Sequence, residues 1–398
     1  MRILHVIPAV GPCYGGPSQV VLELCRALQD GGVQAEICTT DANGQARLPV
    51  KLGKPVRYQD VCCHFFRRDC SEAFKYSRSM ADWLNANIGA YDVAHIHAVF
   101  SYSTYAAAQA CHESSRPYIV RPLGTLEPWS MSQKPIRKQI AWRLVFRNLV
   151  RGARLIHYTT EQERKWTEES LGLRGGIVIP NGVDESLLAV QNSGRFRKTH
   201  GIPDGAPILF TLSRLHPKKG LDLLLKAFAK LKGESQLRAW HLVVAGDGEA
   251  AYVQYLKSLL NGTNAHSFVH WTGWLADQAK LDALAEADLF VLSSHQENFG
   301  IGAVEAMACG TPVLLSQQVG LATQIENARA GWVTKLDVVS LGKELVEATR
   351  DPAELSARGA AAKTLVAKGF TWPRIATEWA SRYKSIRVQK QEPSLVHA

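Results

Sequence analysis

The fold of this chain is decided by residues 293–316, which read SSHQENFGIGAVEAMACGTPVLLS. The apolar runs 289–292, just before this stretch, and 313–316, at its end, are typical of buried parallel strands. Between them, a glycine-containing loop leads into a helix expected over residues 300–309. Gly310 and the proline two positions later are the residues that end such a helix. The stretch therefore predicts a strand, a loop, a helix and a second strand.

Two glutamates bracket the start of the expected helix. Glu297 lies in the loop before it, and Glu305 lies about 8 Å further along, at ~1.5 Å per residue. A helix N-terminus suits a phosphate, and each carboxylate suits a pair of vicinal hydroxyls. A ligand with hydroxyls, then diphosphate, then hydroxyls matches this order, as in a nucleoside-diphosphate sugar. The alternative is that both glutamates are surface charges.

A second group of charges follows the strand expected at residues 208–213. Lys218 and Lys219 lie just before a helix N-terminus, where the helix dipole disfavours cations by ~0.3–1 kcal/mol. A bound anion explains their position, with Arg214 gripping a diphosphate bidentately and Lys219 acting as a point charge. The alternative is a pair of solvated loop cations. No Asp-x-Asp follows a strand, so no metal and no cofactor are expected.

Strands and helices alternate along all 398 residues, which predicts an α/β fold with two doubly wound, Rossmann-like parallel sheets. We expect a first domain at 1–184 and a second, nucleotide-sugar-binding domain at 185–371. A last helix is expected at 372–388, and the tail 389–398 should be disordered. Two such domains predict a ligand in a cleft at the carboxyl ends of the strands.

The formal net charge of +10 suits an anionic partner, and much of it gathers in a basic amphipathic helix expected at 134–154. One reading is a solvated face above a stripe that points into the core. The other is contact with an anionic membrane or a lipid-diphosphate acceptor. Nucleic acid is not expected, because no binding module is recognisable. The basic residues are Lys134, Arg137, Lys138, Arg143, Arg147, Arg151 and Arg154.

The beginning of the chain and its cysteines indicate a cytoplasmic protein, and the basic helix at 134–154 suggests that it docks at the inner membrane face. Residues 1–8 have a short apolar run interrupted by His5 and Pro8, which predicts a first strand rather than a signal peptide. Eight cysteines are present without a Cys-x-x-Cys pair. They are expected to be reduced, and a zinc site is not expected.

The first domain offers three further candidates at the ends of its strands. Gly15 and Gly16 form a flexible loop after the first strand, suited to close backbone approach to a phosphate or sugar, or else a plain turn. His97, which shares a strand face with His95, is a candidate for substrate contact or proton transfer, and equally for a core histidine. Arg121 ends a neighbouring strand and is a weaker candidate.

Taken together, these motifs resemble the retaining nucleotide-sugar glycosyltransferases of family 4, which have the GT-B fold. The Glu297-to-Glu305 spacing is similar to the family's Glu-x7-Glu signature, and Arg214 with Lys219 to its phosphate-binding pair. One departure is Leu123, which stands before Gly124 where many members have histidine.

The resemblance also implies roles for individual residues. Glu297 is expected to contact the donor sugar, and Glu305 the ribose. The resemblance also implies that the helix at 372–388 crosses back to the first domain. The remaining implied donor contacts are Gly15 and Gly16, the Trp274–Leu275 loop at the base, and the backbone of Asn298, Phe299, Gly300 and Ile301 at the sugar and phosphate.

The function expected from residues and resemblance is transfer of a hexosyl unit from a nucleoside-diphosphate sugar, with UDP-glucose as the best example. The acceptor is expected to be a hydroxyl of a growing surface polysaccharide or lipid-linked glycan, and the anomeric configuration to be retained. Three alternatives stay open: a nucleotide-sugar 2-epimerase of the same fold, a glycoside hydrolase that uses the two glutamates, and a non-catalytic glycan-binding protein.

Overall fold

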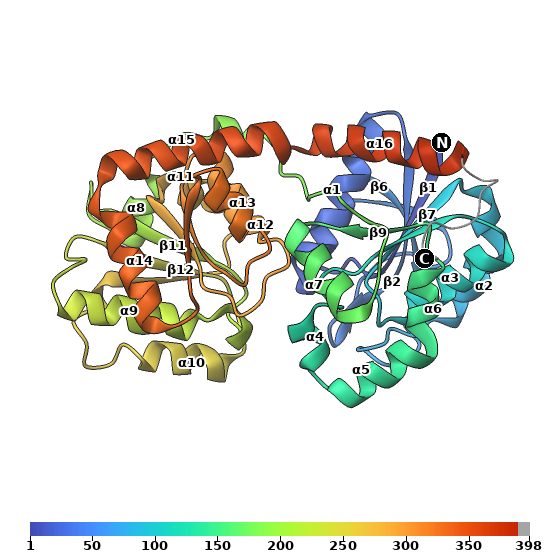
Figure 1. Ribbon diagram of the computed structural model, residues 1–398, viewed down its shortest axis with the longest axis horizontal. Helices are drawn as coiled ribbons and strands as arrows, with labels where there is room; N and C mark the ends of the chain where they lie inside the picture. Colours follow the sequence, from blue (N-terminus) through green and yellow to red (C-terminus); the bar gives the residue numbers. More distant parts are fainter. Residues whose placement is uncertain (389–398) are drawn as a thin grey trace. The chain divides into compact units, whose positions relative to one another are not determined.

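Two mainly parallel β-sheets, each covered by helices on both faces, form the computed structural model, which describes residues 1–388 (Figure 1). One unit comprises Met1–Gly182 together with the segment from Trp372, and the other comprises Val183–Thr371. The boundary after Gly182 lies two residues before the one expected after residue 184. The tail 389–398, expected to be disordered, lies outside the described residues.

The sheet of the first unit has the order β10-β9-β8-β7-β1-β2-β6-β5. All pairs in it are parallel except β5 with β6. The sequence did not predict β5, a short edge strand that begins with proline, as edge strands tolerate. The strands are β1 (Arg2–Ala9), β2 (Gln34–Thr40), β5 (Pro55–Tyr58), β6 (Val61–Phe66), β7 (Val93–His97), β8 (Tyr118–Arg121), β9 (Leu155–Tyr158) and β10 (Gly176–Val178), with a small hairpin of β3 (Ala42–Asn43) and β4 (Ala46–Arg47).

Helices cover both faces of this sheet. One apolar core lies beneath α1 and the C-terminal helix α16, which lie side by side, and a second lies beneath α2, α3 and the basic segment. The sequence did not predict α7, because it is polar and its buried residues are Glu163 and Thr167. The helices are α1 (Gly16–Asp30), α2 (Arg78–Asn87), α3 (Tyr102–Glu113), α4 (Pro128–Ser132), α5 (Pro135–Ala141), a π-helical turn (Trp142–Phe146), α6 (Arg147–Arg151), α7 (Glu161–Leu171) and α16 (Trp372–Val388).

The sheet of the second unit has the order β13-β12-β11-β14-β15-β16, and all its pairs are parallel. The chain runs outward from β11 to β13 and then returns to β14 on the other side of β11. This reversal is the switch point at which doubly wound sheets bind ligands. The strands are β11 (Ile208–Leu212), β12 (His241–Ala245), β13 (Val269–Gly273), β14 (Leu289–Leu292), β15 (Val313–Ser316) and β16 (Gly331–Thr334).

Two apolar cores again separate the sheet from its helices. One packs under α8, α11, α12, α13 and α15, and the other under α9, α10 and α14. The expected helix at 300–309 is α12, one residue shorter at each end. The helices are α8 (Arg195–His200), α9 (Leu221–Gly233), α10 (Ala250–Ser258), α11 (Asp277–Glu286), α12 (Ile301–Ala308), α13 (Ala322–Asn327), α14 (Val338–Arg350) and α15 (Pro352–Gly369).

Within residues 1–388, no helix is both long enough and apolar enough to span a lipid bilayer.

Candidate active site

The loops that follow β11 and β14 pack directly against each other at the switch point of the second sheet. The Ser293 hydroxyl donates a hydrogen bond to the Gly220 carbonyl at 3.0 Å, and the backbone N–H of His295 donates to the Lys218 carbonyl at 2.8 Å. Gly220 has a φ of +60°, and a Cβ there would lie 2.0 Å from the Ser293 carbonyl oxygen. Only glycine allows this approach, which brings the Lys219 loop beside the loop that holds Glu297.

Lys219 and Glu297 form an ion pair through the ammonium and one carboxylate oxygen. Their side chains are only 19% and 20% exposed, so water screens the pair weakly. Burial alone would raise the pKa of Glu297, but the Lys219 ammonium and the backbone N–H of Gly300 lower it below its ordinary value. The Glu297 carboxylate is therefore ionised at neutral pH.

The backbone around Glu297 is held by the loop after β15. The Glu297 N–H donates to the Gln318 carbonyl at 3.1 Å, and the Gly320 N–H donates to the Glu297 carbonyl at 2.8 Å. Gly300 then adopts a φ of +86° and turns the chain into α12. Glu297 thus sits on a braced loop directly before a helix N-terminus, as the sequence predicted.

Glu305, on α12, also has a lysine partner. Its carboxylate contacts the ammonium of Lys280 at 2.7 Å, with side-chain exposures of 17% and 29%. Sequence reasoning missed Lys280, because it comes from α11, 25 residues earlier, and no local pattern links the two positions. The two carboxylates of the signature are therefore each paired with a separate lysine.

Three other expected donor contacts follow strands of the same sheet. Arg214 is exposed just after β11, and no ion pair of its guanidinium is found within the described residues. Trp274 is 64% exposed just after β13, while Leu275 beside it is 8% exposed and belongs to the core. The indole of Trp274 is available for stacking, whereas Leu275 offers a ligand mainly its backbone.

The remaining expected contacts surround the start of α12. Phe299 is 3% exposed and packs into the core, and Asn298 and Ile301 are partly buried. The Phe299 side chain anchors the loop, so ligand contact there is left to the backbone.

The Gly246–Gly248 turn supports the Arg214 loop. A Cβ at Gly246 would lie 1.8 Å from the Ser213 carbonyl oxygen, and one at Gly248 would lie 2.0 Å from that of Leu215. These two glycines let neighbouring loops pack backbone to backbone.

In the first unit, the glycine loop lies at the carboxyl end of β1. Gly15 has a φ of +67° and precedes Gly16, the first residue of α1. Tyr14 holds the loop: its hydroxyl donates to Glu72 at 2.5 Å and accepts from the Gly44 N–H at 2.9 Å. The backbone here has a conformation that favours glycine, in a loop fixed by side-chain contacts.

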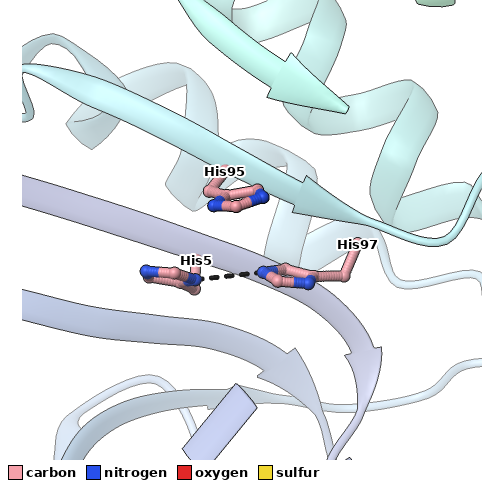
Figure 2. Close-up of side chains that lie close together, drawn as sticks. All are labelled: His5, His95 and His97. Atoms are coloured by element: carbon pink, nitrogen blue, oxygen red, sulfur yellow. Dashed lines mark hydrogen bonds between the residues drawn. The ribbon is translucent and has the colours of Figure 1, made fainter. Parts of the chain in front are cut away.

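His97 lies inside the core of the first unit, as part of a buried histidine cluster (Figure 2). It is 1% exposed, and its Nε2 is 3.0 Å from Nδ1 of His5. The His95 ring stacks on it at 4.6 Å. This placement favours a core histidine over substrate contact.

The three histidines drawn in Figure 2 have nitrogens within 4.8 Å of one another, yet they do not suit a metal ion. Both nitrogens of His95 are already hydrogen-bonded, to Tyr383 at 2.7 Å and to His157 at 3.2 Å. The rings of His95 and His97 are inclined by only 20°, so their in-plane lone pairs do not converge. The buried guanidinium of Arg121 nearby further disfavours a cation.

Leu123 occupies the position where the resemblance leads one to expect histidine. It has a φ of +56°, and Gly124 follows with +69°. The Gly124 N–H donates to the buried Glu163 carboxylate at 2.9 Å. The left-handed turn is thus present without the imidazole.

Comparison with known families agrees with this geometry. The model named Glycosyltransferase Family 4 matches residues 14–187, and the model named Glycosyl transferases group 1 matches residues 192–364. The chain belongs to glycosyltransferase family 4. Glu297, Glu305 and Lys219 therefore lie in an enzyme of this family.

Curated relatives of this glycosyltransferase include two with named activities. D-inositol 3-phosphate glycosyltransferase 2 of Catenulispora acidiphila is 27% identical over 80% of this chain and 77% of that protein. Mannosylfructose-phosphate synthase of Agrobacterium fabrum is 30% identical over 58% of this chain and 52% of that protein.

Solved structures share the whole fold of this glycosyltransferase. Anabaena Alr3699/HepE, in complex with UDP and glucose, superposes with a TM-score of 0.76 at 20% identity, over 97% of this chain and 100% of that one. Sucrose-phosphate synthase (tll1590) from Thermosynechococcus elongatus gives a TM-score of 0.77 at 19% identity, over 98% and 100%. The fold is GT-B, as the sequence predicted.

Proposed function

We propose that this glycosyltransferase moves a hexosyl unit from a nucleoside-diphosphate sugar, with UDP-glucose as the preferred example, to an acceptor hydroxyl with retention of configuration. The observation that carries the proposal is the Lys219–Glu297 pair, held at the switch point directly before α12. The relatives named above that bind UDP with glucose, or act on inositol phosphate, support a nucleotide-sugar donor.

The positions of the two ion pairs suggest which part of the donor each residue binds. The α12 N-terminus and the cations Arg214 and Lys219 face the diphosphate and stabilise its charge as it leaves. Glu297 contacts the sugar, and Glu305, oriented by Lys280, takes the ribose hydroxyls. The exposed indole of Trp274 stacks near the base.

No protein nucleophile is required in this scheme. The leaving phosphate accepts the proton of the attacking acceptor hydroxyl on the same face of the sugar. We assign charge neutralisation to Arg214 and Lys219 rather than to a metal. His97 is left out of the reacting groups, because it is 1% exposed.

The acceptor we propose is a growing surface polysaccharide or lipid-linked glycan, assembled in the cytoplasm. The run from Gly124 to Trp129, which resembles members that build bacterial surface glycans, supports this choice.

A glycoside hydrolase is less consistent with the electrostatics. Such enzymes need one carboxylic acid that stays protonated near neutral pH. Here a lysine lowers the pKa of Glu297, and Glu305 has an ammonium at 2.7 Å. Each carboxylate lies beside a lysine ammonium, and an adjacent positive charge favours the ionised form of a carboxyl group.

The test measures release of the nucleoside diphosphate from UDP-glucose, with and without glycan acceptors, by wild type, Glu297→Ala and Lys219→Ala. Both variants should lose on the order of a hundredfold in turnover, because each loses a charge close to the reacting centre. The exposed Glu326→Gln provides a matched control and should retain full activity.

Near-normal turnover in both variants would refute the proposed site. Conversion of the donor to an epimeric nucleotide sugar without acceptor would indicate the 2-epimerase alternative. Sugar binding without any turnover would indicate a glycan-binding protein.

A further inference from the structure

The basic segment of the first unit has an outward row of large apolar side chains. Ile136, Ile140 and Leu144 are 74%, 54% and 75% exposed. They follow one another at intervals of four residues, so they line one side of the helix formed by α5 and the π-helical turn. We call these three residues the outer stripe. Figure 1 shows α5 at the periphery of the first unit.

The opposite side of the same segment is already occupied by the protein core. Trp142, Phe146 and Val150 are 6%, 4% and 0% exposed and pack in the cluster beneath α2 and α3. Residues two positions apart on a helix, such as Ile140 and Trp142, point about 200° away from each other. The segment therefore has two apolar sides, and packing within the first unit explains only the inner one.

Basic side chains surround the outer stripe. Arg137, Arg143 and Arg147 are exposed, and none of them makes an ion pair with any residue between 1 and 388. Residues 130–160 contain no acidic side chain at all. Lys138 differs, because its ammonium donates to the Ser130 hydroxyl at 3.1 Å and lies over the Phe100 ring. The positive charges of these three arginines beside the outer stripe are therefore not balanced by acidic side chains.

We propose that this surface lies on an anionic phospholipid bilayer, with the outer stripe among the acyl chains and the three arginines on lipid phosphates. A helix with an apolar row and basic flanks binds in the plane of the bilayer interface by these two contributions together. Its 17 residues, from Pro135 to Arg151, extend about 25 Å at ~1.5 Å per residue, parallel to such a plane.

A bilayer fits the surface better than other anionic partners do. Nucleic acid would satisfy the arginines but leave three large apolar side chains in water. A protein partner would need a complementary acidic rim around an apolar groove, which a second copy with the same basic surface does not offer. The choice does not depend on which donor the enzyme uses.

The experiment measures co-sedimentation of the full-length protein with vesicles of phosphatidylcholine alone or mixed with phosphatidylglycerol. Wild type is expected to bind the mixed vesicles and only weakly the neutral ones. The stripe variant Ile136→Ser/Ile140→Ser/Leu144→Ser should bind the mixed vesicles at least tenfold less. Each arginine near an anionic surface strengthens binding on the order of fivefold. The variant Arg137→Gln/Arg143→Gln/Arg147→Gln should therefore also lose at least tenfold.

Two control variants remove an exposed apolar side chain or exposed positive charges outside the basic segment. Val339→Ser removes a 71% exposed apolar side chain on α14, and Arg174→Gln/Lys198→Gln/Arg238→Gln removes three exposed charges. Both should bind vesicles as wild type does. Unchanged release of the diphosphate from donor in solution would show that the stripe variant is folded. Vesicle binding needs no donor, so a failure of the proposed catalytic site leaves this test intact.

Three outcomes would overturn the proposal. The first is vesicle binding that is equal in wild type and stripe variant, and the second is no vesicle binding by wild type. The third is a wild-type dimer, measured by light scattering, that the stripe variant converts to monomer, because the outer stripe would then be a contact between two copies of the chain.

Discussion

At the scale of single residues, the site depends on partners that are remote in sequence. Lys219 and Glu297 are 78 positions apart, and Lys280 and Glu305 are 25 apart. Each pair forms because strands β11 and β14 are neighbours in the sheet, and because α11, which has Lys280 in its first turn, packs against α12. Partial burial makes each charge dependent on its partner, since an unpaired charge in such surroundings is costly.

Gly220 is predicted to be indispensable to this arrangement. In Gly220→Ala, the added Cβ would meet the Ser293 carbonyl oxygen at 2.0 Å, in addition to the cost of a positive φ. Gly201→Ala provides the control, because Gly201 has a φ of +64° with nothing within 4 Å. The control should lose about 1 kcal/mol of stability. Gly220→Ala should lose more than twice as much, together with its activity.

Apparent melting temperature and donor turnover, measured for both variants, test this expectation. Equal losses of stability in the two variants would mean that the β11 and β14 loops do not pack as closely as described.

Lys280→Ala should weaken donor binding without slowing the chemical step. The change removes the partner of Glu305, which we place at the ribose, far from the bond that breaks. The donor KM should rise up to about tenfold while kcat stays close to wild type, the signature of lost uniform binding. Lys198→Ala, at an exposed position on α8, is the control. A drop in kcat with unchanged KM would contradict the assignment of Glu305 to the ribose.

At the scale of elements, a chain of hydrogen bonds joins strands β7 and β9 to helix α16. His157 Nε2 donates to the Ile179 carbonyl at 2.8 Å, because a carbonyl can only accept. With neutral rings, His157 Nδ1 must then accept from His95, and His95 Nδ1 must accept from the Tyr383 hydroxyl at 2.7 Å. The C-terminal helix is thus held on the first unit by a directional buried network.

This network predicts loss of stability in mild acid. Burial, together with the charge of Arg121, lowers the pKa of His5 to about 3 and lowers those of His95, His97 and His157. The unfolded chain takes up protons near pH 6.5 and the folded chain does not. Stability is therefore full above that pH and falls as the pH decreases below it, on the order of 1 kcal/mol per pH unit for each ring.

Melting temperatures between pH 7.5 and 5.0 test this prediction. His5→Phe should make the stability less dependent on pH, because it removes one ring that takes up a proton in the unfolded chain but not in the folded chain. His112→Gln, at an exposed position, should leave the pH dependence unchanged. The pKa of Glu36 is lowered to about 2 by His64 and other partners, so Glu36 makes the stability depend on pH only below about pH 4.5. It therefore does not affect the measurements between pH 7.5 and 5.0. An unchanged slope in His5→Phe would show that the cluster does not control acid stability.

At the scale of the whole molecule, the two units divide the proposed work. The charge pairs of the site lie in the second unit, while the glycine loop and the outer stripe lie in the first. With a formal net charge of +10, the protein should attract anionic ligands and surfaces in general. Specific binding is therefore recognised by which segments of the chain a ligand contacts.

Hydrogen exchange identifies these segments, because a bound ligand slows the exchange of the backbone amides that it orders. UDP should protect the amides of residues 213–220 and 293–305, because a diphosphate at α12 orders both loops. Buried amides of β7 serve as the internal control and should not change. Protection by UDP at residues 11–18 alone would place the nucleotide in the first unit and contradict the proposal.

Most of the fold and the two signature glutamates were predictable from local pattern. The strand at 289–292 and α12 follow from apolar periodicity and glycine placement, which are encoded over a few residues. Helix α7 was not predictable, because its residues are polar and show no apolar stripe. In the helix expected at 134–154, the π-helical geometry of Trp142–Phe146 was not predictable either, because the apolar pattern does not distinguish it from an α-helix.

By itself, the sequence determined the alternation of strands and helices, the strand-loop-helix with Glu297 and Glu305, and the positive charge around residues 134–154. Only the tertiary structure decided that Lys280 pairs with Glu305, that His97 is a core residue, and that Ile136, Ile140 and Leu144 face outward. The physical reason is that periodicity encodes which residues share a face of an element. Whether that face meets the core, a charge or solvent depends on strand order and helix packing, which bring together residues far apart in the chain.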